Sequence, residues 1–127
     1  MSNDNAPVVH WNRATIEHDH LSGNYTLEIP VMFDCPSAEA GIQHELESDY
    51  PGRRWEVASG HIVRDGNGAR AELGYVRLTD PQLLNGNVQP TDLRIAVGNA
   101  VTQQVALARH NDEQNRGRMD SFLASLR

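Results

Sequence analysis

Residues 25–33, with the sequence YTLEIPVMF, show the strictest hydrophobic alternation in the chain, and this pattern limits the possible folds most. One face would carry five large side chains: Tyr25, Leu27, Ile29, Val31 and Phe33. Polar or smaller side chains occupy the alternate positions. This period of two predicts a half-buried strand, and a strand with one buried face requires a second layer to cover it. Pro30 has no N–H to donate, which predicts a sheet edge or a bulge beside it.

The preceding residues 11–20 are predicted to pair with this strand as an antiparallel hairpin. If Ser22 and Gly23 form the turn, His20 lies opposite Tyr25; if Gly23 and Asn24 form it, every pairing moves by two residues. Both registers leave the faces unchanged. The pattern therefore places His18 and His20 on the apolar face of the hairpin.

Residues 34–52, with the sequence DCPSAEAGIQHELESDYPG, predict a helix that follows the first hairpin. Pro36 suits a first turn, Asp34 or Ser37 can cap it, and the Pro-Gly pair at 51–52 ends it. The apolar positions recur at spacings of four: Ala38, Ile42, Leu46 and Tyr50. The stripe is narrow, and we expect it to pack on the sheet.

A second hairpin is predicted over residues 55–78, with the glycine-rich loop 65–68 at its centre. Trp55, Val57 and Val63 would share a core-facing side with Val76 and Leu78. Helical spacing then returns over residues 93–110. The expected fold is α+β: a two-layer domain with an antiparallel four-stranded sheet of two hairpins, helices on one face and the order ββαββα.

The chain length predicts one domain, and we expect it to span residues 8–110 after a flexible tail at 1–7. Leu, Ile, Val and Phe make up 28 of the 127 residues, so the core is thin and burial against another copy becomes attractive. Residues 111–127 are left over as a helical segment or tail, either continuous with the preceding helix or separate from it.

The composition excludes several functions and places the protein in the cytoplasm, or in the host cytoplasm if the protein is viral. All eleven basic residues are Arg, so Schiff-base lysine chemistry and the P-loop lysine are absent. No apolar run is long enough to span a membrane, and the lone Cys35 fits a reducing compartment. No nucleotide, calcium or hydrolase motif is present, and we expect no cofactor and no enzyme activity.

His18, His20 and His61 are the candidate metal ligands. The i, i+2 spacing of the first two puts both imidazoles on one strand face, and His61 falls on the same predicted face of the second hairpin. This trio is the basis of an alternative function, a metal- or ligand-binding domain or an enzyme. The other interpretation is that the two hairpin histidines form a polar edge, satisfied by water or by Asp19.

Arg53, Arg54 and Trp55 form a short basic and aromatic cluster, the pattern of a nucleic-acid contact. The alternative is that the Trp enters the core while both Arg side chains pair with the acidic helix just before them. A net charge of −6 disfavours nucleic acid, which binds mainly through a basic field.

The last segment repeats an amphipathic pattern of Met119, Phe122, Leu123 and Leu126. A helix with this spacing is typical of partner docking, and the alternative is that it folds back on its own domain. We expect a small non-catalytic protein that acts through protein–protein contacts with a partner or with itself, as a homo-oligomer. Its size also fits an accessory protein of a virus or mobile element, such as an inhibitor or a particle component.

Overall fold

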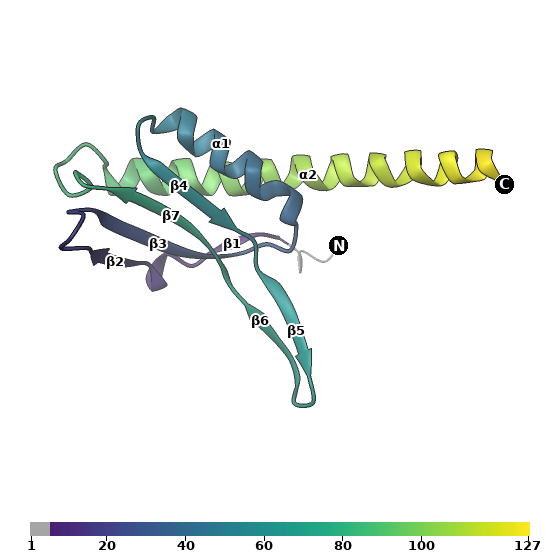
Figure 1. The fold of residues 1–127 in the computed structure, drawn as a ribbon, viewed down its shortest axis with the longest axis horizontal. Helices are drawn as coiled ribbons and strands as arrows, with labels where there is room; N and C mark the ends of the chain where they lie inside the picture. The colour runs from purple at the N-terminus through teal and green to yellow at the C-terminus, as the bar shows by residue number, and fades with distance from the viewer. Residues whose placement is uncertain (1–5) are drawn as a thin grey trace.

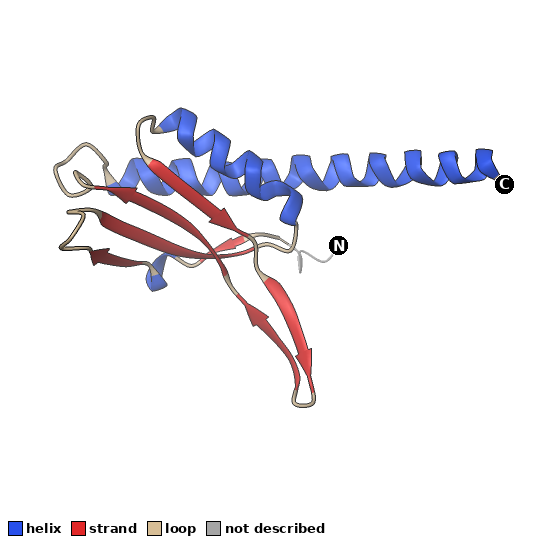
Figure 2. Ribbon diagram, viewed as in Figure 1, coloured by secondary structure: helices blue, strands red, loops and turns tan. Residues whose placement is uncertain are grey.

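The computed structural model describes residues 6–127, which form a twisted antiparallel main sheet covered on one face by two helices, and a separate two-stranded hairpin (Figures 1 and 2). The expected tail at 1–7 therefore falls largely outside the described residues. The strands are β1 (Val8–Val9), β2 (Thr15–His18), β3 (Tyr25–Met32), β4 (Arg54–Ala58), β5 (His61–Asp65), β6 (Gly68–Glu72) and β7 (Gly74–Asp80). The helices are η1 (Trp11–Arg13), η2 (Pro36–Ala38), α1 (Glu39–Asp49) and α2 (Pro90–Leu126).

The α+β class with antiparallel strands and two long helices is confirmed, but the expected four-strand sheet and the order ββαββα are wrong. The main sheet has five strands, in the order β1-β3-β7-β4, with β2 also paired to β3. β1 and β2 lie end to end along the same edge of β3, and η1 connects them. At Pro30 the strand paired with this edge of β3 changes from β2 to β1. The edge or bulge predicted beside Pro30 is therefore a gap between these two neighbouring strands.

The turn between β2 and β3 is longer than either predicted version. His18 lies opposite Tyr25 and Ile16 opposite Leu27, so residues 19–24 form the connection. Asp19 accounts for the difference, because its carboxylate accepts hydrogen bonds from the Leu21 N–H at 2.9 Å and the Ser22 hydroxyl at 3.0 Å. These bonds stabilise the ionised form and lower the pKa of Asp19. The predicted face of the hairpin is unchanged, but His20 belongs to the turn.

The core lies between the sheet and the two helices, as the alternation at 25–33 requires. Ile29, Val31, Val76 and Leu78 from the two central strands are at most 1% exposed. The apolar residues predicted for the first helix and those on the inner face of α2 pack against these strands: Ala38, Ile42, Leu46, Leu93, Val97, Val101 and Val105. The two helices meet at Gly41, where a Cβ atom would lie 2.5 Å from the side-chain oxygen of Gln104 and would force that side chain to move. Gln104, the one polar residue on the inner α2 face, donates to Glu45 at 3.2 Å.

The second hairpin leaves the sheet halfway along its length. β4 and β7 belong to the sheet, whereas β5 and β6 pair only with each other and project as an arm (Figure 1). At the bend a side chain on Gly74 would overlap the carbonyl of Ala58, and Glu39 of α1 accepts hydrogen bonds from the N–H and hydroxyl of Ser59. The register is continuous through the bend, yet Val63 lies on the arm and not in the core, which corrects the prediction from periodicity.

Residues 111–126 continue the preceding helix, because α2 runs unbroken from Pro90 to Leu126. The polar run at 111–118 interrupts the apolar pattern without ending the helix, because it contains no proline and consists mainly of residues that helices tolerate. The leftover segment is thus the second half of one long helix.

Candidate functional site

The outer half of α2 stands clear of the domain. Every residue from 110 to 127 is exposed, and the helix extends past both α1 and the sheet (Figure 1). The last contacts with the domain are an ion pair between Arg109 and Asp34 at 3.0 Å and a hydrogen bond from Ser37 to Asp112 at 2.8 Å. Among the described residues, the side-chain hydrogen bonds beyond Asp112 stay within the helix itself.

Four large apolar side chains lie on this projecting half, and we call them the stripe. They are 45–69% exposed: Met119, Phe122, Leu123 and Leu126. The sequence prediction that these residues form a contiguous apolar surface agrees with their helical spacing and exposure. The alternative of folding back on the domain is not what the structure shows.

The stripe continues the same helix face that the inner half buries in the core. Positions 101, 105, 108, 112, 115, 119, 122 and 126 follow alternating spacings of four and three residues, the heptad pattern of helices that pack against a partner. Val101, Val105 and Ala108 at the inner end are buried, and Asp112 and Asn115 separate them from the stripe. The outer half therefore keeps a packing face but has nothing packed on it in the described chain.

A second apolar surface lies at the opposite end of α2, and we call it the groove. It has a volume of about 310 Å³ and lies between η1 and β2 on one side and the 81–89 loop and the first turns of α2 on the other. Its main lining residues are Trp11, Ile16, Leu27, Leu84, Leu93 and Arg94. Leu84 and Ile16 are 61% and 51% exposed, so their apolar surface is open to solvent.

Arg94 lies at the rim of the groove, with its guanidinium 5.4 Å from the centre of the Trp11 ring. Within residues 6–127 the Arg94 side chain makes this cation–π contact and no ion pair. Trp11 and Leu84 are 73 positions apart in sequence, and sequence reasoning missed the groove. The signal available was the pair Leu83-Leu84 in an otherwise polar loop, because one of two adjacent leucines in such a loop enters the core and the other is left outside.

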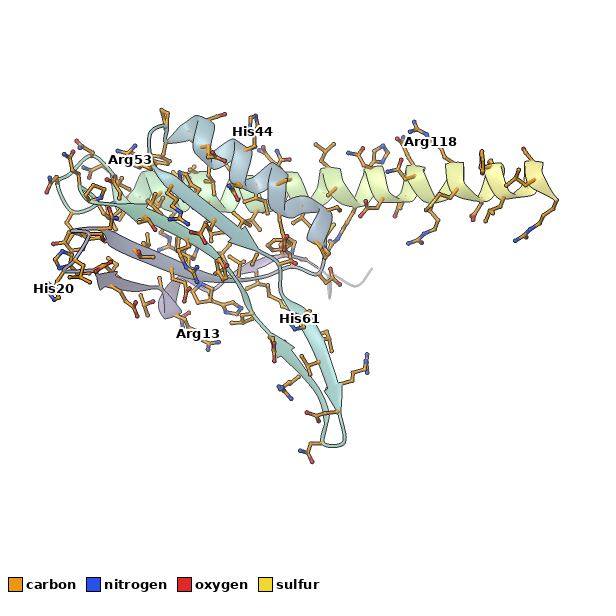
Figure 3. All side chains as sticks on the ribbon, in the orientation of Figure 1. Arg13, His20, His44, Arg53, His61 and Arg118 are labelled. Carbon is orange, nitrogen blue, oxygen red and sulfur yellow. The ribbon has the colours of Figure 1, made fainter. Side chains whose placement is uncertain are left out.

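His18, His20 and His61 do not come together. His18 stacks on Tyr25 with ring centroids 4.3 Å apart, and His20 lies edge-on to His18 at 4.8 Å. His61 is on the arm, where it lies 3.0 Å from Glu72, and Figure 3 shows it well away from His20. The prediction that His61 lies on the same face as the other two histidines assumed that the second hairpin stays flat in the sheet, and this assumption is wrong. Within the described residues no group of three or more His, Cys, Asp or Glu side chains could hold a metal ion.

Arg53, Arg54 and Trp55 do not form a shared basic surface. Trp55 is 2% exposed in the core and donates to the Tyr50 carbonyl, as the core interpretation expected. The partners of the two arginines are not the acids of the preceding helix. Arg53 bonds Asp80 at 2.7 Å, and Arg54 bonds Glu56 in its own strand at 3.1 Å.

The sheet face opposite the helices is polar and crosslinked. Arg77 bonds Glu28 at 2.6 Å and Glu56 at 3.4 Å, and its guanidinium lies 3.9 Å over the Tyr75 ring. The hydrogen bond from Arg77 to Glu28 raises the pKa of the arginine, which stays charged. Because each of these charges has a partner in the same sheet, the face is held together across strands β3, β7 and β4.

Comparison with known proteins identifies no relative of this chain: no family model matches it, and neither a curated protein nor a solved structure is similar to it. Within residues 6–127, no helix combines the length and the apolar composition that crossing a bilayer requires.

Proposed function

We propose that this protein is a non-catalytic module that works through protein–protein contacts and associates with copies of itself through the stripe on the outer half of α2. The observation that carries this proposal is the exposure of four large apolar side chains on a helix that has left its own domain. An apolar face of this kind on a projecting helix is typical of an interaction surface.

The energetics support a role for the stripe. Burying a Leu, Met or Phe side chain completely contributes roughly 1.5–3 kcal/mol, so four of them supply at most about 6–12 kcal/mol. Association costs about 4–15 kcal/mol in lost freedom of motion. The two ranges overlap, so the stripe can drive association if the surface that receives it is well formed.

The length of the projecting helix supports the same conclusion. An isolated helix of about 12–15 residues is marginal in water, and Gly117 lowers its stability by about a further 1 kcal/mol relative to Ala. The outer half gains helix nucleation from the inner half but no packing from the domain. Packing against a second copy would supply the stabilisation that the segment lacks.

The test is the double substitution Phe122→Glu/Leu126→Glu. The matched control is Ser121→Glu/Ser125→Glu, which adds the same charges at the same i, i+4 spacing one position earlier, away from the stripe. We expect the wild type and the control to form the same oligomer in sedimentation velocity and the stripe variant to sediment as a monomer with unchanged circular dichroism. A wild type that stays monomeric at high micromolar concentration, or a stripe variant that associates normally, would refute the proposal.

The roles expected from size and composition, an inhibitor or a particle component in the cytoplasm, stay predictions. Self-association is a property that a particle component needs.

A further inference from the structure

We infer that the stripe of one copy binds in the groove of another copy, so that the chains join head to tail. This inference rests on the proposed self-association and adds the identity of the receiving surface. Each copy would then carry one half of the interface at each end of α2 (Figure 1).

The positions of the two surfaces exclude an internal contact. Leu93 in the groove and Phe122 in the stripe are 29 positions apart on the same unbroken helix, which at 1.5 Å per residue separates them by about 44 Å. A rigid helix cannot bring its own two ends together. If the groove receives a stripe, that stripe comes from another molecule.

The two surfaces agree in chemistry. The groove is lined by apolar side chains with Arg94 at its rim, and the stripe presents apolar side chains flanked by Arg118 on one side of Met119 and by Asp120 on the other. Arg94 contacts the Trp11 ring, and Asp120 makes no hydrogen bond or ion pair with the described residues. Docking the stripe in the groove would bury apolar surface on both sides and bring these opposite charges close to each other.

Pairing of two stripes is the competing arrangement, and its contact is small. The heptad pattern is apolar only from Met119 to Leu126 on the outer half, because Asp112 and Asn115 occupy the preceding core positions. The sequence signature of a coiled coil is an apolar heptad pattern sustained over about three to four heptads. Stable interfaces bury about 1,200–2,000 Å², which four side chains on each of two helices do not approach readily. The groove differs from a second stripe in being a concave apolar surface formed by several elements of the fold.

Trp11 gives an independent optical signal. It is half-buried in the groove, whereas Trp55, the other tryptophan, is already in the core. Assembly through the groove should shift the emission of Trp11 to shorter wavelength as concentration rises, and Trp11→Phe should remove this response. A concentration-dependent shift that persists in Trp11→Phe would contradict occupation of the groove.

The decisive experiment mixes two variants of the full chain. The groove variant is Ile16→Glu/Leu84→Glu, at two exposed positions, and its matched control is Ile62→Glu/Leu21→Glu, which changes the same residue types on the arm and in the β2–β3 turn. The stripe variant is Phe122→Glu/Leu126→Glu. We expect each of the groove and stripe variants alone to associate at least about 30-fold more weakly than wild type, the size of a hot-spot loss, and the control to associate normally.

Mixed in equal amounts, the two variants should form a dimer that does not grow further, because one intact groove and one intact stripe remain between them. A groove variant that self-associates like wild type, or a mixture that stays monomeric, overturns the head-to-tail arrangement. The first of these results leaves the proposed self-association standing, whereas a monomeric wild type removes both.

Discussion

Both halves of α2 present large apolar side chains at helical spacing, but their surroundings are opposite. Val97, Val101 and Val105 on the inner half are at most 1% exposed, whereas Met119 and Phe122 on the outer half are 60% and 66% exposed. The inner half owes its burial to the sheet and α1, not to a different sequence pattern. Periodicity therefore identifies a face that needs a partner, and the rest of the chain decides whether that partner is internal.

The largest expected effect is a difference in stability between substitutions in the two halves of α2. Val101→Asp places a charge without a partner in the core, which should destabilise the fold by more than about 4 kcal/mol and abolish the cooperative thermal transition. Met119→Asp, on the same helix face, should change the stability of the monomer by less than about 0.5 kcal/mol. Thermal unfolding followed by circular dichroism at low concentration checks both. Equal losses would mean that the outer half is packed on the domain.

The next prediction concerns the loop that leads into the inner half. Asp80 is 7% exposed and accepts hydrogen bonds from Arg53 and from the Gln82 N–H, which fixes the beginning of the 81–89 loop. Arg53→Ala leaves this carboxylate with one partner fewer and should cost about 3 kcal/mol in urea unfolding. Because the 81–89 loop forms one wall of the groove, its loosening should also weaken association although the stripe is intact.

Arg54→Ala is the control for this change. Its ion pair with Glu56 is exposed, and such pairs contribute about 0–1 kcal/mol. If Arg54→Ala lowered the free energy of unfolding as much as Arg53→Ala does, the effect would come from removing a positive charge and not from releasing the 81–89 loop.

Gly117→Ala should stabilise the outer half and leave the inner half unchanged. Replacing an exposed helical glycine by alanine contributes about 1 kcal/mol, and no neighbouring atom would contact the added methyl group. Hydrogen exchange should slow for the amides near residue 117 in the monomeric stripe variant, while the amides near Val101 exchange as before. Slower exchange along the whole helix would mean that the two halves unfold together.

The smallest expected effect is that of the charges at the inferred interface. Arg94→Asp and Asp120→Arg should each weaken association, and combining them should restore about 0.5–1 kcal/mol of the loss. A double-mutant cycle measured by sedimentation equilibrium gives this coupling. A coupling of zero would place Asp120 away from the groove rim.

The sequence predicted the local elements better than their three-dimensional relations. The alternation at 25–33 and the spacing of Ala38, Ile42 and Leu46 both correspond to buried faces, because each follows from the geometry of a single element. The arm was missed since its strand pattern is continuous with β4 and β7. The bend depends on close contacts of Gly74 with Ala58 across the hairpin and of Gly60 with Met32 of β3, which periodicity does not reveal.

The same difference between single elements and combinations of elements holds for the candidate sites. The four residues of the stripe lie exposed on one helix, as their spacing predicted, and their role in binding stays a prediction. The three histidines do not come together, because their convergence required two hairpins to lie in one sheet. The groove joins η1, β2 and the 81–89 loop, and no pattern within any one of them indicates the others. Surfaces made by one element can be predicted from periodicity, and surfaces made by several elements require the fold.

Sedimentation velocity of the full chain and of a chain shortened after His110, over a range of concentrations, tests the central claim most directly. The full chain should show a sedimentation coefficient that rises with concentration, and the shortened chain should remain a monomer with the near-ultraviolet circular dichroism of the intact core. A shortened chain that assembles as the full chain does, or a full chain that is monomeric throughout, would contradict association through the outer half of α2.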